Sequence, residues 1–213
     1  MEFTHLLDIA GNEPVFESGL LLAGAVDPTN VRRQLSRWTK AGRLYQLRRG
    51  LYALSPPFQK VKPHPFVVAN RMMRSSYVSL QSALRHYGLI PDVVPVTTSV
   101  TTGRPNRWET PLGVYTFRHV KTDLFSGYRL IDLGGKQQAF VATPEKALLD
   151  LVHLQPGGDA PEYLQEELRL QNLVVLDLER LQHQAELASS PKLRRAVASV
   201  IEVAQSEGEY EML

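Results

Sequence analysis

Few side chains in this chain could carry catalytic or metal chemistry, and their spacing does not suit it. Its 213 residues include no cysteine, which excludes disulfide scaffolds, thiolate metal sites and cysteine nucleophiles. The six histidines never fall at the spacing of metal ligands: His5, His64, His86, His119, His153 and His183. We expect each to be a surface or packed residue, and we expect no metal and no cofactor.

Two further patterns could support catalysis, and each has a simpler explanation. Residues 134–137 (Gly-Gly-Lys-Gln) are a partial phosphate loop, but Leu130 replaces the first glycine and no Ser or Thr follows the lysine, so a turn is predicted. No G-x-S-x-G elbow occurs. Glu145 falls in the first turn of a predicted helix, where the dipole favours an anion, and Asp150 lies on another face. A metal-dependent nuclease is the least favoured alternative; its candidate ligands are Asp123, Asp132, Glu145 and Asp150.

The distribution of charge is the stronger signal. The chain has 24 Lys and Arg against 22 Asp and Glu, a net charge of +2. Residues 1–27 carry a net −5, residues 28–108 a net +13, and residues 109–213 a net −6. No carboxylate occurs between residues 28 and 91. Such a basic block is typical of a surface that binds phosphates, and the alternative is a solvated face without a partner.

The basic block begins in a predicted helix-turn-helix. Apolar residues over 3–10 predict a first helix, and a second is predicted over 14–24. A third helix is predicted from Pro28 to about Ala41, with Asp27 as its cap and Gly42 as its stop. Two helices joined by a tight turn are typical of this DNA-binding motif.

The third predicted helix has two chemically distinct faces. At about 100° per residue, Val31, Leu35 and Trp38 form one apolar stripe. Polar and cationic side chains occupy the rest of the surface, and we expect those at positions 30, 33 and 37 to read bases and those at 32 and 40 to bind phosphates. The residues predicted to meet DNA on this helix are Thr29, Asn30, Arg32, Arg33, Ser36, Arg37 and Lys40.

A predicted β-hairpin follows the helix. Its strands over 43–47 and 51–54 flank a turn that contains Arg48, Arg49 and Gly50. A hairpin behind a recognition helix is a wing, whose arginines contact phosphates or the minor groove. A plain surface hairpin with charged edges is the alternative.

The helix and the hairpin together predict a salt dependence of DNA binding. If about six cations neutralise phosphates, the plot of log affinity for DNA against log salt concentration should have a slope of roughly −5.

The remaining pattern predicts a second domain of class α+β. Residues 56–65 contain four prolines and predict a stiff connector between a winged helix-turn-helix domain over 1–55 and a domain over 66–213 with a small sheet and several helices. Helices are expected over 66–73, 79–88, 143–154 and 162–170 and from Asp177 and Pro191, and strands over 94–102, 113–120, 128–133 and 138–142.

Three segments resemble the AbiEi-type antitoxin family. Residues 44–54 (Leu-Tyr-Gln-Leu-Arg-Arg-Gly-Leu-Tyr-Ala-Leu) resemble that family's winged-helix module. Residues 77–90 and 143–151 resemble recurrent segments of its C-terminal domain. The resemblance spans roughly residues 5–170, and Tyr87 departs from an expected histidine–glycine pair.

This resemblance implies a bacterial transcription regulator of the type IV toxin–antitoxin class, which acts in phage defence. Members repress their own operon by binding inverted repeats in the promoter through the winged helix. The C-terminal domain counteracts a nucleotidyltransferase-like toxin, and a stable complex with the toxin is not required. These properties are expectations for the present chain.

Two other expectations complete the prediction. An RNA-binding regulator that uses the same basic surface is an alternative, although Tyr45 and Tyr52 are too few for a stacking platform. No apolar stretch approaches the ~18 residues that cross a bilayer. The first residues also lack the basic region and apolar run of a signal peptide, so we expect a cytoplasmic protein without a membrane partner.

Overall fold

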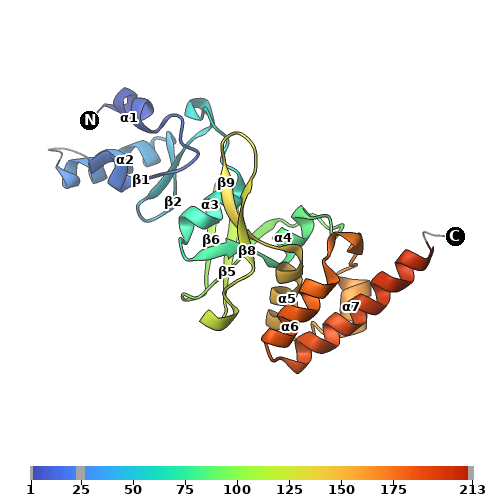
Figure 1. The fold of residues 1–213 in the computed structure, drawn as a ribbon. Coiled ribbons are helices and arrows are strands. Elements are labelled where there is room, and N and C mark those ends of the chain that lie inside the picture. Colours follow the sequence, from blue (N-terminus) through green and yellow to red (C-terminus); the bar gives the residue numbers. More distant parts are fainter. Residues whose placement is uncertain (1, 23–26, 211–213) are drawn as a thin grey trace.

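The protein is an α+β chain of two adjoining parts, shown by a computed structural model (Figure 1). The structure describes the backbone of residues 2–22 and 27–210 and the side chains of these ranges as far as residue 205. A smaller N-terminal part contains a three-stranded sheet, and a larger C-terminal part contains a six-stranded sheet with helices beside it.

The N-terminal part packs two helices against a small antiparallel sheet with strand order β1-β3-β2. Its elements are α1 (Phe3–Ala10), β1 (Phe16–Glu17), the 3-10 turn η1 (Ser18–Leu22), α2 (Pro28–Lys40), β2 (Leu44–Arg48) and β3 (Leu51–Leu54). Helix α2 begins as predicted, because the Asp27 carboxylate accepts a hydrogen bond from the Thr29 backbone N at 2.8 Å. It ends just before Gly42, whose φ of +70° suits a glycine.

The second helix predicted over 14–24 is wrong in its first part, where the strand β1 forms instead. Phe16 pairs with Tyr52 and Glu17 with Leu51, so the segment joins the hairpin as a third strand. The Phe16 and Tyr52 rings also stack, with centroids 5.9 Å apart. A single 3-10 turn, η1, follows, and residues 23–26, where this predicted helix would have ended, lie outside the described residues. Cross-strand pairing thus outweighs the local helical pattern.

The apolar stripe of α2 holds the helix to this part. Val31, Leu35 and Trp38 are all buried, as predicted. Phe3 of α1 meets the Trp38 ring edge-on at 5.3 Å. Other members of the same core come from α1, η1 and the sheet: Leu6, Ala10, Phe16, Leu21, Leu44, Tyr52 and Leu54. The opposite face of α2 is consequently left to solvent.

The C-terminal part is built on a mixed sheet with strand order β6-β7-β5-β4-β9-β8. The pairs β5–β7 and β4–β9 are parallel, and the other pairs are antiparallel. The strands are β4 (Ser76–Val78), β5 (Val96–Thr101), β6 (Asn106–Thr110), β7 (Gly113–His119), β8 (Tyr128–Asp132) and β9 (Gln138–Ala142). The helices are α3 (Pro65–Met72), α4 (Leu80–His86), α5 (Pro144–Leu154), α6 (Leu178–Leu187) and α7 (Pro191–Tyr210).

This sheet is larger than predicted. Strand β6 was missed because Asn106, Arg107 and Glu109 give it no apolar alternation, and pairing with β7 creates it at the sheet edge. Strand β4 is too short to stand out in sequence.

The helix predicted over 162–170 is a π-helical turn, η4 (Tyr163–Glu167). Short 3-10 turns occur at η2 (Pro56–Phe58), η3 (Thr122–Leu124) and η5 (Leu173–Val175).

The proline-rich connector is anchored to the C-terminal part. The side chain of Gln137, in the turn between β8 and β9, donates to the Lys62 carbonyl at 3.0 Å and accepts from the His64 backbone N at 2.9 Å. The connector contains some regular structure, since Pro56 opens the turn η2 and Pro65 opens α3, where a proline is tolerated.

The hairpin β2–β3 is packed on both sides. Val15, Leu47, Leu51 and Ala53 belong to the same buried cluster as the core of the C-terminal part. Strand β2 also contacts the edge strand β6. The two parts therefore share a continuous apolar contact, with the hairpin between them (Figure 1).

Candidate nucleic-acid interface

The outward face of α2 presents every side chain that was predicted to meet DNA from this helix. All seven residues are exposed: Thr29, Asn30, Arg32, Arg33, Ser36, Arg37 and Lys40. Within the described part of the chain, the side chains of Arg32, Arg33, Arg37 and Lys40 make no ion pair and no hydrogen bond. This face therefore offers four cations whose donors are free for an external anion.

Arg48, predicted to bind a phosphate, is engaged inside the protein. Its guanidinium donates to the carbonyl of Met72 at 2.8 Å and to that of Arg71 at 3.1 Å, at the end of α3. Its side chain is only 27% exposed, and one terminal nitrogen lies 3.8 Å from a carboxylate oxygen of Glu17. Through these contacts the Arg48 side chain joins the hairpin to α3. Arg49, by contrast, is exposed at the tip.

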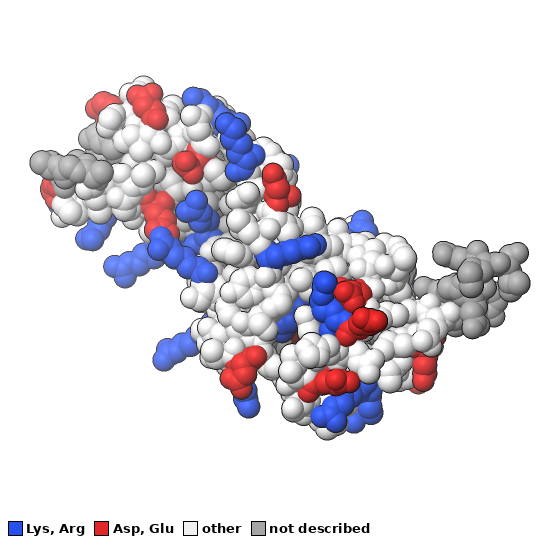
Figure 2. Space-filling model, in the orientation of Figure 1, with Lys and Arg blue, Asp and Glu red and all other residues white. Residues whose placement is uncertain are grey.

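Two arginines that the sequence did not single out lie beside the hairpin tip. Arg71 is adjacent because its carbonyl receives Arg48, and Arg74 is held by a two-oxygen contact with Glu17 at 2.8 and 2.9 Å. Both are exposed. With Arg49 they form a tip cluster of Arg49, Arg71 and Arg74. Figure 2 shows Lys and Arg side chains gathered where the two parts meet.

A buried polar cluster lies in the C-terminal part, and only the fold brings it together. The carboxylate of Asp150 in α5 accepts hydrogen bonds from the Tyr77 hydroxyl at 2.9 Å and the Ser79 hydroxyl at 2.8 Å, while Lys146 Nζ lies 2.5 Å from its other oxygen. Burial raises the pKa of Asp150, whereas Lys146, Ser79 and Tyr77 all oppose that shift. Tyr77 and Ser79 come from residues 77–90, and Lys146 and Asp150 from 143–151, the segments that carry the family resemblance.

The acids considered for a nuclease site point to different partners. Glu145 is buried, and its Oε1 accepts the backbone N of Asp177 at 3.0 Å, so it joins α5 to the start of α6. This contact, and not the helix dipole alone, explains why a glutamate occupies this buried position. Asp132 accepts from the Gly134 backbone N at 2.8 Å in the turn before β9. Within the described residues, no three His, Cys, Asp or Glu side chains gather as a metal site would require.

His64 and His86 lie at packed or capping positions. His64 Nδ1 accepts the Phe66 backbone N at 3.2 Å and caps α3. Burial, and to a lesser extent His86, lowers the pKa of His64. Burial also lowers the pKa of His86, with a further contribution from Arg129. The resulting preference for neutral rings agrees with a structural role.

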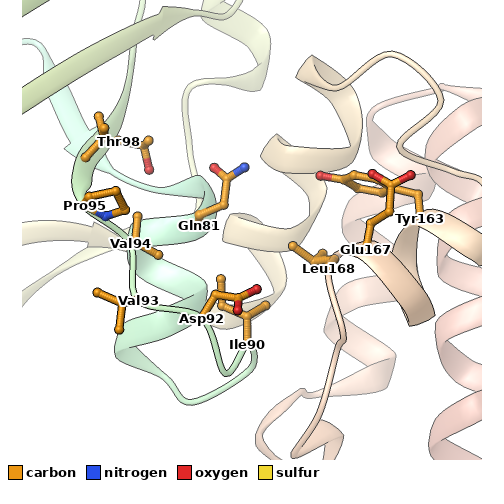
Figure 3. Close-up of a pocket in the computed structure, with 11 residues that line it drawn as sticks. Gln81, Ile90, Asp92, Val93, Val94, Pro95, Thr98, Tyr163, Glu167 and Leu168 are labelled. Atoms are coloured by element: carbon orange, nitrogen blue, oxygen red, sulfur yellow. The ribbon is translucent and has the colours of Figure 1, made fainter.

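A shallow hollow of about 410 Å³ lies between α4 and η4 (Figure 3). Gln81 and Tyr163 reach toward one another across it, and Val94 and Pro95 form part of its wall. Of its two carboxylates, Asp92 is ion-paired with Arg169, and Glu167 lies at the other side. We find no group of convergent donors here that favours one ligand.

No protein-family model matches this chain, and no curated protein shows significant similarity to it. Within the described residues, no helix is both long enough and apolar enough to cross a membrane.

Proposed function

We propose that this protein is a sequence-specific DNA-binding regulator that places α2 in the major groove. The observation that carries the proposal is the free cationic face of α2, opposite a fully buried apolar stripe. Arg, Lys and Asn are the side chains that contact phosphates and base edges, and a helix is the element that the major groove admits. The interface contains no cofactor in this proposal.

The connectivity of the N-terminal part supports a winged helix-turn-helix. A helix, a strand, a short helical turn, a second helix and a hairpin follow in order, and the first strand pairs with the last. This is the order expected of a winged helix in which η1 takes the place of the first helix of the motif. The Arg49 tip would then lie against the DNA backbone, as wings do.

We assign the roles of individual side chains by position along α2. Asn30, Arg33 and Arg37 are the proposed base readers, with Thr29 and Ser36 as polar neighbours. Proposed phosphate contacts come from α2, the hairpin tip and the end of α3: Arg32, Lys40, Arg49 and Arg71. Arg74 is already paired with Glu17 and is not counted among them. Arg48 serves in this scheme as a positioning residue that fixes the wing to α3.

The finer assignment, an AbiEi-type antitoxin, rests on the resemblance of three sequence segments. Two of them supply the buried cluster of Tyr77, Ser79, Lys146 and Asp150, which gives those motifs a common structural purpose. On this assignment the protein represses its own operon at promoter inverted repeats, and its C-terminal part counteracts a nucleotidyltransferase-like toxin without a lasting complex.

Binding of the full chain to duplexes from its own promoter region tests the proposal. Arg33→Ala or Arg37→Ala should weaken binding to the preferred duplex and reduce the preference by ~1–3 kcal/mol, as loss of a bidentate base contact does. Arg49→Ala should weaken binding to all duplexes alike, and Lys136→Ala, in an exposed turn, should change neither. If both classes of variant behaved the same, the division into readers and phosphate contacts would be wrong.

Competition with structured RNA distinguishes the alternative. A DNA regulator should keep its preferred duplex in the presence of equal masses of folded RNA. Transfer of the protein from the duplex to the RNA would contradict the proposal and favour an RNA-binding regulator.

Co-expression with a toxin encoded beside this chain tests the antitoxin assignment, with rescue of growth as the expected result.

A further inference from the structure

A cleft of about 460 Å³ opens in the C-terminal part, far along the chain from the basic face of α2. One wall is the polar face of α5, where Lys146, Asp150 and His153 line the cleft. Facing them are the segment around η3 and the turn that joins α6 to α7. The volume lies within the range of small-molecule sites.

A buried lysine lines this cleft. The Lys146 side chain is 9% exposed, and the only protein partner of its Nζ within the described residues is Asp150 Oδ1. An ammonium carries three N–H donors, and buried donors are normally satisfied. Since Lys146 lines the cleft, its remaining donors are available to a group bound there.

The ammonium is held in a fixed position by its surroundings. Tyr77 and Ser79 both donate to the second oxygen of Asp150, which fixes the carboxylate that orients Lys146. The Lys146 stem also passes Gly127 so closely that an added Cβ there would lie 3.0 to 3.2 Å from it. The backbone of Gly127 has a φ of +72°, which favours glycine independently. A donor fixed in this way is typical of a built site rather than of a surface lysine.

Further polar groups surround the opening. Lys121 and Asp123 line it from the η3 side, and Ser126 lies between them and β8. Burial lowers the pKa of His153, as do Lys146, Lys192 and Lys121, while Asp150 opposes the shift. Gln184 adds a buried Oε1 that has no hydrogen-bond partner within the described residues. Beyond its bond to Asp150, the Lys146 ammonium thus has donors without a protein acceptor, and Gln184 Oε1 has no protein donor, within the described residues.

We propose that this cleft binds a small organic anion whose phosphate or carboxylate meets Lys146 and Lys121 and whose hydroxyl or amino group donates to Gln184. Leu149, Leu187 and Leu193 provide apolar contact for the rest of the ligand. Tyr77, Ser79 and Asp150 are positioning residues that act through Lys146. The proposal does not depend on DNA binding, because none of these residues lies on α2 or the hairpin.

Titration of the full chain, followed by two-dimensional NMR, tests the site with three probes: inorganic phosphate, citrate and AMP. We expect saturable shifts from citrate or AMP at amides around Lys121, Lys146 and Gln184, with inorganic phosphate weaker because it lacks the organic contacts. A stronger response to AMP identifies a phosphorylated ligand, and a stronger response to citrate a carboxylate.

Two variants make the test specific. Lys121→Glu, on the exposed rim, should lower the affinity for the probe by about fivefold or more, corresponding to ~1 kcal/mol. Lys136→Glu, in the turn at the opposite end of β8, makes the same charge change and should leave affinity unaltered. Gln184→Leu should weaken binding as well, without removing any charge.

Three results would overturn the proposal. One is the absence of saturable shifts with all three probes, and another is an equal loss in Lys121→Glu and Lys136→Glu, which would indicate a general effect of net charge. The third is a set of shifts confined to residues outside the cleft.

Discussion

At the scale of single residues, the stability of the C-terminal part depends on the buried pair of Asp150 and Lys146. Asp150 is 2% exposed and is the only hydrogen-bond and ion-pair partner of the buried Lys146 ammonium within the described residues. Asp150→Ala would leave this cation buried without its counter-ion, and two hydroxyls would lose their acceptor. We therefore expect a loss of about 3–5 kcal/mol in the free energy of unfolding.

Urea unfolding of the two proteins measures that loss. Asp123→Ala, at an exposed position near the same cleft, is the matched control and should change stability by less than about 0.5 kcal/mol. An Asp150→Ala variant as stable as the wild type would mean that the buried pair does not support the fold.

Arg48 and Arg49 are neighbours with different predicted effects. Arg48→Ala removes donors to the carbonyls of Met72 and Arg71, and we expect it to cost about 1–2 kcal/mol of stability after allowance for its partial exposure. Arg49→Ala should leave the melting temperature unchanged but weaken DNA binding. Thermal unfolding of both variants separates the roles. If Arg48→Ala melted like the wild type, Arg48 would return to the set of phosphate contacts.

At the scale of elements, the cap of α3 links stability to pH. His64 must be neutral at Nδ1 to accept the Phe66 N–H, and burial holds the pKa of His64 below its ordinary value of 6.5. As pH falls below 6.5, the unfolded chain takes up a proton that the folded chain resists, so stability is present above this pH and declines as pH approaches the folded pKa.

His64→Asn replaces the ring nitrogen by an amide oxygen that can cap the helix but does not titrate. The decline in melting temperature between neutral and mildly acidic pH should therefore be smaller in this variant than in the wild type. His119→Asn, at an exposed position, serves as the control. Equal declines in His64→Asn and the wild type would show that the cap does not contribute to the pH dependence.

Local patterns predicted the elements that carry strong local signals. Helix α2 was predicted to within a residue, since its cap, apolar spacing and terminal glycine all agree. Helix α1 and the strands β8 and β9 also lie where they were expected. Strands β1 and β6 were missed because each exists only through pairing with a partner, at the positions of Phe16 and Trp108 among others.

The candidate sites also combine features that local sequence patterns predict with features that they do not. The face of α2 could be predicted because helical periodicity alone places Arg33 and Arg37 opposite Val31. The tie of Arg48 to α3 could not, because 24 residues separate it from Met72. The buried cluster around Asp150 joins residues 73 positions apart in sequence, and no local spacing indicates that contact.

At the scale of the whole molecule, charge is sorted between regions of the chain. The segment 28–108 carries the excess of cations, and some of them lie on α2, at the hairpin tip and at the end of α3. The hairpin is packed against both parts, so a ligand that contacts α2 and Arg71 meets surfaces that are fixed relative to one another. The proposed DNA-binding role therefore requires a single duplex to contact both surfaces.

The salt dependence of duplex binding tests the central claim most directly. Affinity of the full chain for promoter DNA would be measured at several salt concentrations, with log affinity plotted against log salt. If about six phosphates are neutralised, the slope should be roughly −5, and Arg49→Ala should reduce its magnitude by about 1. A slope near zero, or tight binding that persists unchanged in high salt, would contradict a phosphate-binding surface on α2 and the hairpin.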